Sequence, residues 1–505
     1  MTEDKEQQNS YKSITKATAI FGGTQMANMA ATIIKGKLSA LLIGAYGLGI
    51  SAHLYSSALP IQQIFTCGLN MSAVQTISST IDERERTEHV ICLRRMIMVL
   101  ATMATVTTMA SAWWLSQLTF GTTEHWPWFV TIAFAIGFLI LASGEATILQ
   151  GHRKLKALAA CNMAAPVAGL LVSIPLYFLW GIEGIAPSIA LLGIISWITA
   201  RYFTHKIQYD KNVRQTWSET LSKGRKTIVM GASIMISNIV GSIATYAINT
   251  CIGNIGNEAD VGFYQAATNI TIQCTSMVFT AMATDYFPHL SSIIRERAKA
   301  QDLTCKEGEM TILVIAPIVL ILITFAPVAI RVLLTREFDA IIFLLRAMSL
   351  CLISRAVCFP LDYICLAHGD NKFFMILEGG WSNIETVGLV LAGYALGGID
   401  GIGIALLIRS VIDVIVSIVV NRWRYKMTYS SKYYKMASIL TIAAVACFAF
   451  SFIKETWIAF TLMTIITIIT GIFAYRQIDQ RINIMFIINN RIHGKNKCTS
   501  GCVQR

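Results

Sequence analysis

Apolar stretches of about 20 residues follow one another along almost the whole chain, with short polar turns between them. A helix of about that length crosses the ~30 Å hydrocarbon layer of a membrane, so the pattern predicts about fourteen membrane-spanning helices. The expected spans are 14–42, 49–78, 90–115, 127–150, 157–180, 184–204, 226–252, 261–288, 309–334, 340–367, 373–396, 401–421, 434–453 and 456–475. The sequence therefore predicts an all-α polytopic membrane protein.

The chain also repeats itself at an offset of 217 residues. Leu149-Gln-Gly-His-Arg-Lys154 precedes Leu366-Ala-His-Gly-Asp-Asn371 by this offset, and Gly181-Ile-Glu-Gly-Ile-Ala186 precedes Gly398-Ile-Asp-Gly-Ile-Gly403. Each repeat holds six spans, and because six is even, both halves face the same way about a pseudo-twofold axis along the membrane normal. The expected parts are a six-helix lobe at 1–215, a second at 216–428, two further helices within 429–480 and a tail at 481–505.

Two parallel six-helix lobes predict a cleft between them that opens to either side of the membrane in turn. This arrangement is the physical basis of alternating access. Transport is therefore the first function that the pattern indicates.

Composition and charge exclude the soluble classes of protein. Hydrophobic residues make up 54% of the chain and charged residues only 14%. The net charge of +12 would indicate a nucleic-acid partner only if the basic residues gathered on one folded face. Instead, 33 of the 41 Lys and Arg fall in the tails and even-numbered turns, three fall on the opposite side and five lie within spans. Since Lys and Arg favour cytoplasmic loops, both termini are expected in the cytoplasm.

Basic residues within spans are candidates for binding an anion. They are Lys35, Lys37, Arg346, Arg355 and Arg409. An ionised side chain at the bilayer centre costs roughly 2.5–3.5 kcal/mol, so each needs a partner or a watery cavity. Arg346 is expected to reach for the outer interface. Arg409 has Asp413 four residues later, so either the two neutralise each other along one helix face or they serve the substrate or a coupling ion.

The expected helix 340–367 carries one narrow polar face. It comprises Cys351, Arg355, Cys358, Asp362 and Cys365. The face is either a cavity wall that binds an anion through Arg355 or a packing seam in which Arg355 and Asp362 pair two turns apart.

Polar stripes on repeat-equivalent helices favour a shared central cavity. They comprise Gln25, Asn28, Thr32 and Lys35 on the first span, Asn238, Ser242, Thr245 and Asn249 on the seventh, and Gln265, Asn269 and Gln273 on the eighth. His53 is the only histidine within a span. It either lines the cavity, where an imidazole can titrate near neutral pH, or packs as a hydrogen-bonded residue.

Several carboxylates could carry a coupling proton or Na⁺. The candidates are Glu145, Asp285, Asp362, Glu378, Glu385 and Asp413. Soluble-enzyme signatures, glycine-rich phosphate loops and metal-ligand clusters are absent from the sequence. We therefore expect no catalytic residue, no metal and no cofactor besides the coupling ion.

The stretch Lys37-Leu-Ser-Ala-Leu-Leu-Ile-Gly44, followed by Tyr46-Gly-Leu-Gly49, resembles the first-helix signature of the polysaccharide flippases of the MOP superfamily, of the O-antigen and lipid III translocase type. Ala45 stands where that family usually has Gly-Pro. The helix number, the layout of six, six and two helices, the paired glycine turns and Asp285-Tyr-Phe-Pro288 fit the same family.

The resemblance implies a transporter that turns an undecaprenyl-diphosphate-linked oligosaccharide from the cytoplasmic to the periplasmic leaflet of a bacterial inner membrane. Its cationic cavity would contain Lys35, Lys37, Arg355 and Arg409. The resemblance points to Lys37, whereas the helical-face argument prefers Lys35, and both are kept. Expected partners are the lipid-linked substrate, membrane lipids and a glycan polymerase, without nucleic acid.

Two other classes of function stay open. A cation-coupled multidrug or metabolite antiporter of the same fold would favour acidic and aromatic residues over basic ones in its cavity. A membrane enzyme of glycan assembly, such as a polymerase or ligase, would carry a sizeable periplasmic loop, whereas the outward turns here are short.

Overall fold

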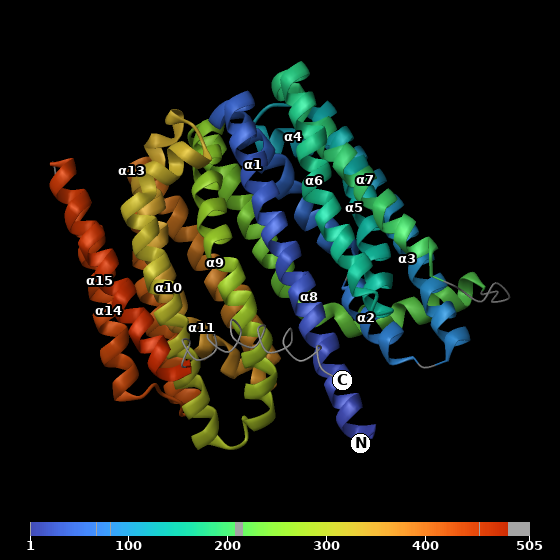
Figure 1. Cartoon of the computed structure of the whole chain (residues 1–505). Coiled ribbons are helices and arrows are strands. Elements are labelled where there is room, and N and C mark those ends of the chain that lie inside the picture. Colours follow the sequence, from blue (N-terminus) through green and yellow to red (C-terminus); the bar gives the residue numbers. More distant parts are fainter. Residues whose placement is uncertain (1, 67, 81, 208–215, 454, 483–505) are drawn as a thin grey trace, which may run out of the picture. The chain divides into compact units, whose positions relative to one another are not determined.

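The computed structural model describes residues 2–66, 68–80, 82–207, 216–453 and 455–482, and every regular element in these ranges is a helix (Figure 1). The α-helices are α1 (Thr2–Thr66), α2 (Leu69–Ser79), α3 (Glu83–Ala110), α4 (Ala112–Phe120), α5 (Trp126–Gly151), α6 (Leu155–Trp180), α7 (Ile185–His205), α8 (Trp217–Ile255), α9 (Glu258–Ile293), α10 (Arg297–Leu333), α11 (Ile342–Ala367), α12 (Asn371–Phe374), α13 (Ser382–Arg424), α14 (Ser431–Phe450) and α15 (Thr456–Ile482). The 3₁₀ helices are η1 (Gly181–Gly184) and η2 (Arg336–Ile341), and η3 (Met375–Trp381) is a π-helix.

The predicted all-α polytopic membrane fold is confirmed. Among the described residues, nine helical stretches are long and apolar enough to cross a membrane. Three of them, Met26–Thr66, Lys156–His205 and Lys372–Arg424, are 41, 50 and 53 residues long, and each contains the turn between two expected spans. The figure of fourteen crossings stays a prediction.

The longest helices are interrupted where the sequence predicts turns. In α1 the backbone leaves the helical conformation at Gly44, and in α13 it does so at Gly397 and Gly398. The N–H of Ala45 donates to the Glu337 carboxylate at 3.2 Å, which satisfies a backbone group at the start of the next helical stretch.

Two expected spans are divided in the structure. The span 49–78 breaks at Gly68, which has a φ of 64°, and the span 90–115 breaks at Ser111 between α3 and α4. The apolar pattern runs through both breaks, so hydropathy gave no sign of them.

The chain forms two compact units, each assembled from separate stretches of sequence. Unit 1 contains residues 1–267, 330–341 and 371–402, and unit 2 contains residues 268–329, 342–370 and 403–505.

The core of unit 1 is centred on α5. Phe129, Ile132, Ile136 and Ile140 are at most 1% exposed, and their helical spacing places them along one side of α5. Helices α1, α3, α6 and α7 pack against this helix, and Figure 1 shows α5, α6 and α7 side by side. A closely packed helical body of this kind can position the side chains of α1.

Unit 2 is built on α10 and α11. Ala316, Val319 and Ile323 of α10 are fully buried. Helix α14 packs against α11 and α15, and the two red helices lie together in Figure 1. The Thr324 hydroxyl of α10 lies 2.9 Å from the Thr467 hydroxyl of α15, so the C-terminal helices are joined to α10 by polar as well as apolar contacts.

The sequence repeat is visible at the ends of α5 and α11. Nδ1 of His152 lies 2.9 Å from the backbone carbonyl oxygen four residues earlier, and Nδ1 of His368 lies 3.0 Å from its counterpart. The next residue has a positive φ in both places, 54° at Arg153 and 74° at Gly369. These equivalent residues are 216 positions apart, one fewer than the offset assigned to this motif from the sequence.

The glycine turns that follow are also equivalent. Gly181 has φ 55° and ψ −126°, and Gly398 has φ 59° and ψ −142°, a region that residues with a Cβ rarely adopt. Three residues later, a Cβ would lie 2.5 Å from a backbone carbonyl oxygen at Gly184 and 2.0 Å from one at Gly401. Here the offset is 217, so the second half has gained one residue between its two motifs.

The π-helix η3 lies between these motifs and accounts for the extra residue. A π turn holds one residue more than an α turn, so it absorbs a single-residue insertion without displacing the helix beyond it. Asn383 donates its side-chain N–H to the carbonyl oxygens of Glu378 and Gly379 at 3.0 and 2.9 Å. These contacts satisfy backbone groups at the end of the widened turn.

Candidate transport site

Lys35 lies in unit 1, on the part of α1 that packs against α6. Its side chain is half-buried, with Nζ 6.0 Å from the centre of the Tyr55 ring. A Cβ built at Gly169 of α6 would lie 3.5 Å from Nζ, so the glycine leaves room beside the ammonium group. Among the described residues, no carboxylate lies within ion-pair distance of Lys35.

Lys37 of α1 binds backbone carbonyl groups at the end of α10, in unit 1. Its Nζ donates to the carbonyl oxygen of Arg331 at 2.9 Å and also to that of Leu334. These carbonyls end α10, where no further helical N–H can satisfy them, and a cation there complements the helix dipole. Lys37 therefore ties α1 to the last turn of α10.

Arg355 lies in unit 2 on α11. It is exposed, and its guanidinium lies 5.4 Å from the centre of the Phe279 ring. Within the part of unit 2 that the structure describes, no carboxylate is at ion-pair distance from it.

The other members of the predicted polar face on α11 differ in their surroundings. Cys358 and Cys365 are 7% and 5% exposed, whereas Cys351 is half-buried. Asp362 accepts a hydrogen bond from the Ser417 hydroxyl at 3.0 Å. The face therefore has an exposed part at Arg355 and a packed part at the two buried cysteines.

Arg409 and Asp413 form the ion pair that their spacing predicts. Nη2 and Oδ2 are 3.3 Å apart, and both side chains are half-buried. Arg346 donates from Nε to the carbonyl oxygen of Ile323 at 3.1 Å, so it binds α10 where the sequence predicted a side chain reaching for the interface. Both cations are thus engaged by groups of the protein.

Glu145 holds three helices of unit 1 together. Its carboxylate is contacted by Arg94 from Nε at 3.1 Å and from Nη2 at 3.0 Å, by Arg201 at 2.9 Å and by the Thr204 hydroxyl at 2.6 Å. Glu145 is 6% exposed, and its two oxygens accept two hydrogen bonds each. The buried charge on α5 is compensated by arginines from α3 and α7.

The remaining candidate carboxylates lie on three helices. Glu378 belongs to η3 and Glu385 to the first turn of α13, and both are half-buried in unit 1. Asp285 is exposed on α9 in unit 2.

The predicted polar stripes are not uniform. Gln25 lies outside the described side chains of α1, and Asn28 is half-buried. On α8, Asn238 is exposed, the Ser242 hydroxyl donates to the Gln63 side chain at 2.7 Å, and Asn249 is fully buried. In unit 2, α9 carries Asn269 exposed and Gln273 half-buried.

His53 is fully buried beside a carboxylate that sequence reasoning missed. Its Nε2 lies 3.0 Å from Oε2 of Glu258, the first residue of α9. Glu258 falls outside the expected span 261–288, so it was not considered among the intramembrane groups. The sequence does contain one indication of this carboxylate. His53 is a titratable residue within a span, and such a group, when buried, needs a polar partner at the same depth in the membrane.

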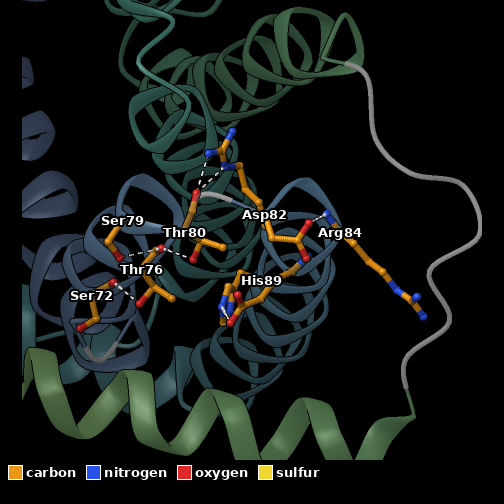
Figure 2. Close-up of polar contacts among 9 residues, drawn as sticks. Ser72, Thr76, Ser79, Thr80, Asp82, Arg84 and His89 are labelled. Carbon is orange, nitrogen blue, oxygen red and sulfur yellow. Dashed lines mark hydrogen bonds and ion pairs between the residues drawn. The ribbon is translucent and has the colours of Figure 1, made fainter.

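Figure 2 shows the turn between α2 and α3, one of the basic turns on which the predicted orientation depends. Asp82 accepts the N–H groups of Arg84 and Glu85 at 3.4 and 3.3 Å and so caps α3. Arg86 donates from Nε to the carbonyl oxygen of Thr80 at 3.1 Å. The Arg84 side chain extends away from these contacts and is exposed.

Three solved structures of membrane transporters have a similar fold. The chain aligns over 92% of its length with 99% of the lipid II flippase MurJ in an inward closed conformation, at 13% identity and a TM-score of 0.70. A multidrug resistance MATE family transporter of the MOP superfamily, in its inward-facing conformation, aligns over 81% of this chain and 98% of its own, at 16% identity and a TM-score of 0.66. A MOP superfamily transporter from Pyrococcus furiosus aligns over 81% and 96%, at 16% identity and a TM-score of 0.57.

These identities establish likeness of fold, and no curated protein matches the chain. A family model described as "Polysaccharide biosynthesis protein" matches residues 61–343, which is more than half of the chain. The family match and the shared fold confirm the resemblance to MOP-type polysaccharide flippases that the sequence carries. The chain belongs to the polysaccharide biosynthesis protein family and has the fold of the MOP superfamily transporters.

Proposed function

We propose that this protein flips an undecaprenyl-diphosphate-linked oligosaccharide, such as an O-antigen unit, from the cytoplasmic to the periplasmic leaflet of a bacterial inner membrane by alternating access. Membership of a polysaccharide biosynthesis family supports the class of substrate, and the transporter fold supports translocation. The predominance of Lys and Arg in the tails and even-numbered turns supports cytoplasmic termini.

The observation that carries the proposal is which of the five intramembrane cations already bind a carboxylate or carbonyl group of the protein. Lys37 binds carbonyls at the end of α10, Arg346 binds a carbonyl of α10, and Arg409 pairs with Asp413. Lys35 and Arg355 have no such carboxylate or carbonyl contact among the described residues. A cation kept within a span at a cost of roughly 2.5–3.5 kcal/mol is explained if it meets an anion during the transport cycle.

A diphosphate suits these two positions chemically. It is strongly anionic, and a lysine ammonium or an arginine fork can offset its desolvation by charge-assisted hydrogen bonds. The glycan needs many hydrogen-bonding groups, which the exposed or half-buried Asn28, Asn238 and Asn269 can supply. Lys35 is therefore preferred to Lys37 as the substrate-binding lysine.

A coupling ion, a proton or Na⁺, remains part of the proposal. Of the candidate carboxylates, Glu145 suits that role least, because both of its oxygens already accept two hydrogen bonds from the protein. Asp413 is paired with Arg409 and Asp362 with Ser417. Glu378 within the π-helix, Glu385 in the first turn of α13 and the exposed Asp285 are the other carboxylates to test.

The proposal is tested by flipping in proteoliposomes that contain undecaprenyl-diphosphate oligosaccharide, with the exposed glycan measured by an impermeant glycosidase. Lys35→Gln should lower the initial rate at least about tenfold, because a hydrogen bond from a charged group is worth about 1.5–3 kcal/mol. Lys35→Arg should retain much of the rate. Arg355→Gln should abolish flipping, while Arg355→Lys keeps part of it.

Lys37→Gln is the matched control. It removes a cation from the same helix, but one that serves the end of α10, so it should lower thermal stability while substrate affinity is retained. Undiminished flipping by Lys35→Gln and Arg355→Gln together would refute the proposal.

A cation-coupled antiporter is the second candidate, favoured by the fold shared with a multidrug resistance MATE family transporter. That function predicts proton- or Na⁺-driven uptake of an organic cation that survives Lys35→Gln. It also predicts that the diphosphate-linked glycan neither binds nor competes.

A further inference from the structure

Within unit 1, α1 meets the turn between α8 and α9 in a seam of backbone contacts. A Cβ at Gly49 would lie 1.7 Å from the carbonyl oxygen of Glu258, and one at Gly262 would lie 2.0 Å from that of Ala45. Only glycine allows so close an approach, which is how membrane helices pack tightly without a hydrophobic driving force. We call Ala45, Gly49 and His53, with Gly253, Glu258 and Gly262, the α1–α9 seam.

A contact between a buried histidine and a carboxylate lies in this seam. His53 is fully buried and Glu258 is 16% exposed, and their Nε2 and Oε2 atoms are 3.0 Å apart. A Cβ at Gly253 would lie 2.6 Å from Nε2, so glycine at 253 makes room for the ring. The Phe120 ring packs edge-on against the imidazole, with centroids 5.3 Å apart.

The closed seam leaves polar groups incompletely satisfied. Among the described residues, Nδ1 of His53 has no hydrogen-bond partner, and the Glu258 oxygen lies off the direction that an aligned hydrogen bond from Nε2 requires. Both side-chain polar atoms of Asn249 are likewise buried without a partner. Asn249 precedes Gly253 by one turn on the same face of α8. These groups would gain hydrogen bonds on meeting water, so the seam can open at modest cost.

The seam also joins the two lobes that the sequence repeat predicts, since His53 belongs to 1–215 and Glu258 to 216–428. In the orientation proposed above, it lies toward the outer side, roughly 13 Å along α1 from the turn at Gly44. An alternating-access transporter must open and close such a contact in each cycle.

We propose that the His53–Glu258 pair is a proton-operated latch on the outer gate, and that closing this gate takes up one proton from the periplasmic side. This rests on the proposed transport cycle. In the open seam, in water near neutral pH, an imidazole is mostly neutral and a carboxylate is charged. Sealing the two together removes most of the water around the carboxylate, and a proton on the imidazole would then offset its charge. The proton joins Nε2 of His53 as the seam closes and leaves to water as it opens.

The other titratable groups on elements packed around this part of α1 have partners of their own. Among the acidic groups, Asp260 accepts a hydrogen bond from Tyr394 at 2.6 Å, Glu337 accepts the Ala45 N–H and Glu183 accepts from Trp128. The His125 ring stacks on Trp128, and Lys37 binds the end of α10. The hydroxyl of Tyr246 contacts Thr119, and that of Tyr177 contacts Ser188. Cys251 of α8 is half-buried, and the charged groups of α3 and α7 lie in their predicted cytoplasmic ends. His53 and Glu258 are therefore the pair that should respond to pH at this seam.

The test measures opening of the seam directly. Ser56 is 4% exposed and shares a face of α1 with Gly49 and His53. In a full-length variant without native cysteines, Ser56→Cys is labelled from the periplasmic side with an impermeant maleimide between about pH 6 and about pH 8.5. Rates are divided by those of Thr122→Cys, an exposed position, which removes the pH dependence of the thiol reaction itself.

Normalised labelling should rise with pH, by up to about tenfold per pH unit, the limit for release of one proton. With His53→Gln or Glu258→Gln, labelling should be high and independent of pH. With His125→Gln, the matched control in the same region, the pH dependence should remain. Labelling that does not change with pH in the native background, or that keeps its slope with His53→Gln, overturns the latch.

Ser57→Cys, also 4% exposed and on the same side of α1, replaces Ser56→Cys if that variant does not fold. The labelling requires no glycolipid. If labelling depends on pH but the protein flips no glycolipid, the proposed substrate is rejected and the latch is retained. If the protein flips glycolipid normally but labelling does not depend on pH, the latch is rejected and the proposed substrate is retained.

Discussion

The segments Leu155–Trp180 and Asn371–Gly397 follow equivalent histidine-capped helix ends and lead into equivalent glycine turns. The first is a regular α-helix that contains Pro166 and Pro175. The second has no proline and carries the π-helix η3. Proline and a π turn both interrupt the helical hydrogen-bond ladder, so the same element of the two halves is interrupted by different chemical means.

The difference also separates the charges of the two halves. The first segment has no acidic residue, and its Gly169 borders the ammonium group of Lys35. The second carries Glu378 within the π-helix and Glu385 just beyond it. A repeat that preserved its turns has thus diverged in the charged residues that this segment carries.

The largest expected effect is at the equivalent close approaches of the two turns, Gly184 and Gly401. Gly401→Ala and Gly184→Ala should each cost about 1–3 kcal/mol or more, because the new Cβ meets a backbone oxygen that cannot move like a side chain. Gly401→Ala should be the worse, since its contact would be 2.0 Å against 2.5 Å. Thermal unfolding of the purified variants measures both. Gly388→Ala, with nothing within 4 Å, is the control, and a neutral Gly401→Ala would contradict the structural equivalence.

The next effect concerns the extra residue. Deleting Gly380 should convert η3 to an α-helix of the length found in the first half, so the protein should still fold, with flipping reduced about tenfold or more as the turn near Glu378 rearranges. Deleting Val167 from the regular helix α6 should instead lower the yield of folded protein. The monodispersity of the purified protein and the rate of flipping in proteoliposomes distinguish the two deletions. If both deletions lower the yield of folded protein equally, the π-helix does not accommodate the extra residue.

The smallest effect is at the paired histidines. Burial, with help from the charges of Arg86, Lys154 and Arg94, lowers the pKa of His152 from 6.5. A lowered pKa means that the folded protein prefers the neutral ring, so the contribution of His152 is complete above pH 6.5 and is lost as the pH falls below it. His152→Gln should cost about 1 kcal/mol at alkaline pH, and the gap from wild type should narrow on acidification.

His368→Gln removes the equivalent cap of α11 and serves as the matched variant. Thermal unfolding across pH measures both substitutions. A gap for His152→Gln that widens as the pH falls would show that the ring is stabilised in its charged form.

Apolar length alone located most helices, because a membrane fixes how long each must be. The span 127–150 differs by one residue at each end from α5, Trp126–Gly151. The comparison of the two repeats does not reveal the single-residue insertion. Both sequence motifs can be aligned at an offset of 217 residues, although the histidine-capped helix ends are 216 residues apart, because the π-helix between the motifs absorbs the extra residue. Hydropathy does not predict the helix breaks at Gly68 and Ser111 either, because both residues lie within apolar sequence.

The site was less predictable than the fold. Helical spacing places Lys35 and Lys37 on different faces of α1, but it cannot say that the end of α10 lies opposite Lys37. The pair Arg409–Asp413 was predictable because both members lie on one helix. Glu258 was not, because its partner His53 is more than two hundred residues away in the sequence.

The carboxylate of Glu145 has a consequence for how the chain is made. Arg94 precedes it by 51 residues and Arg201 follows it by 56. During synthesis, α3 is therefore complete when α5 leaves the ribosome, so the insertion machinery can receive Glu145 already neutralised by Arg94. Arg201 arrives only with α7, and its docking on the same carboxylate would mark the moment at which the nascent helices become a closed bundle.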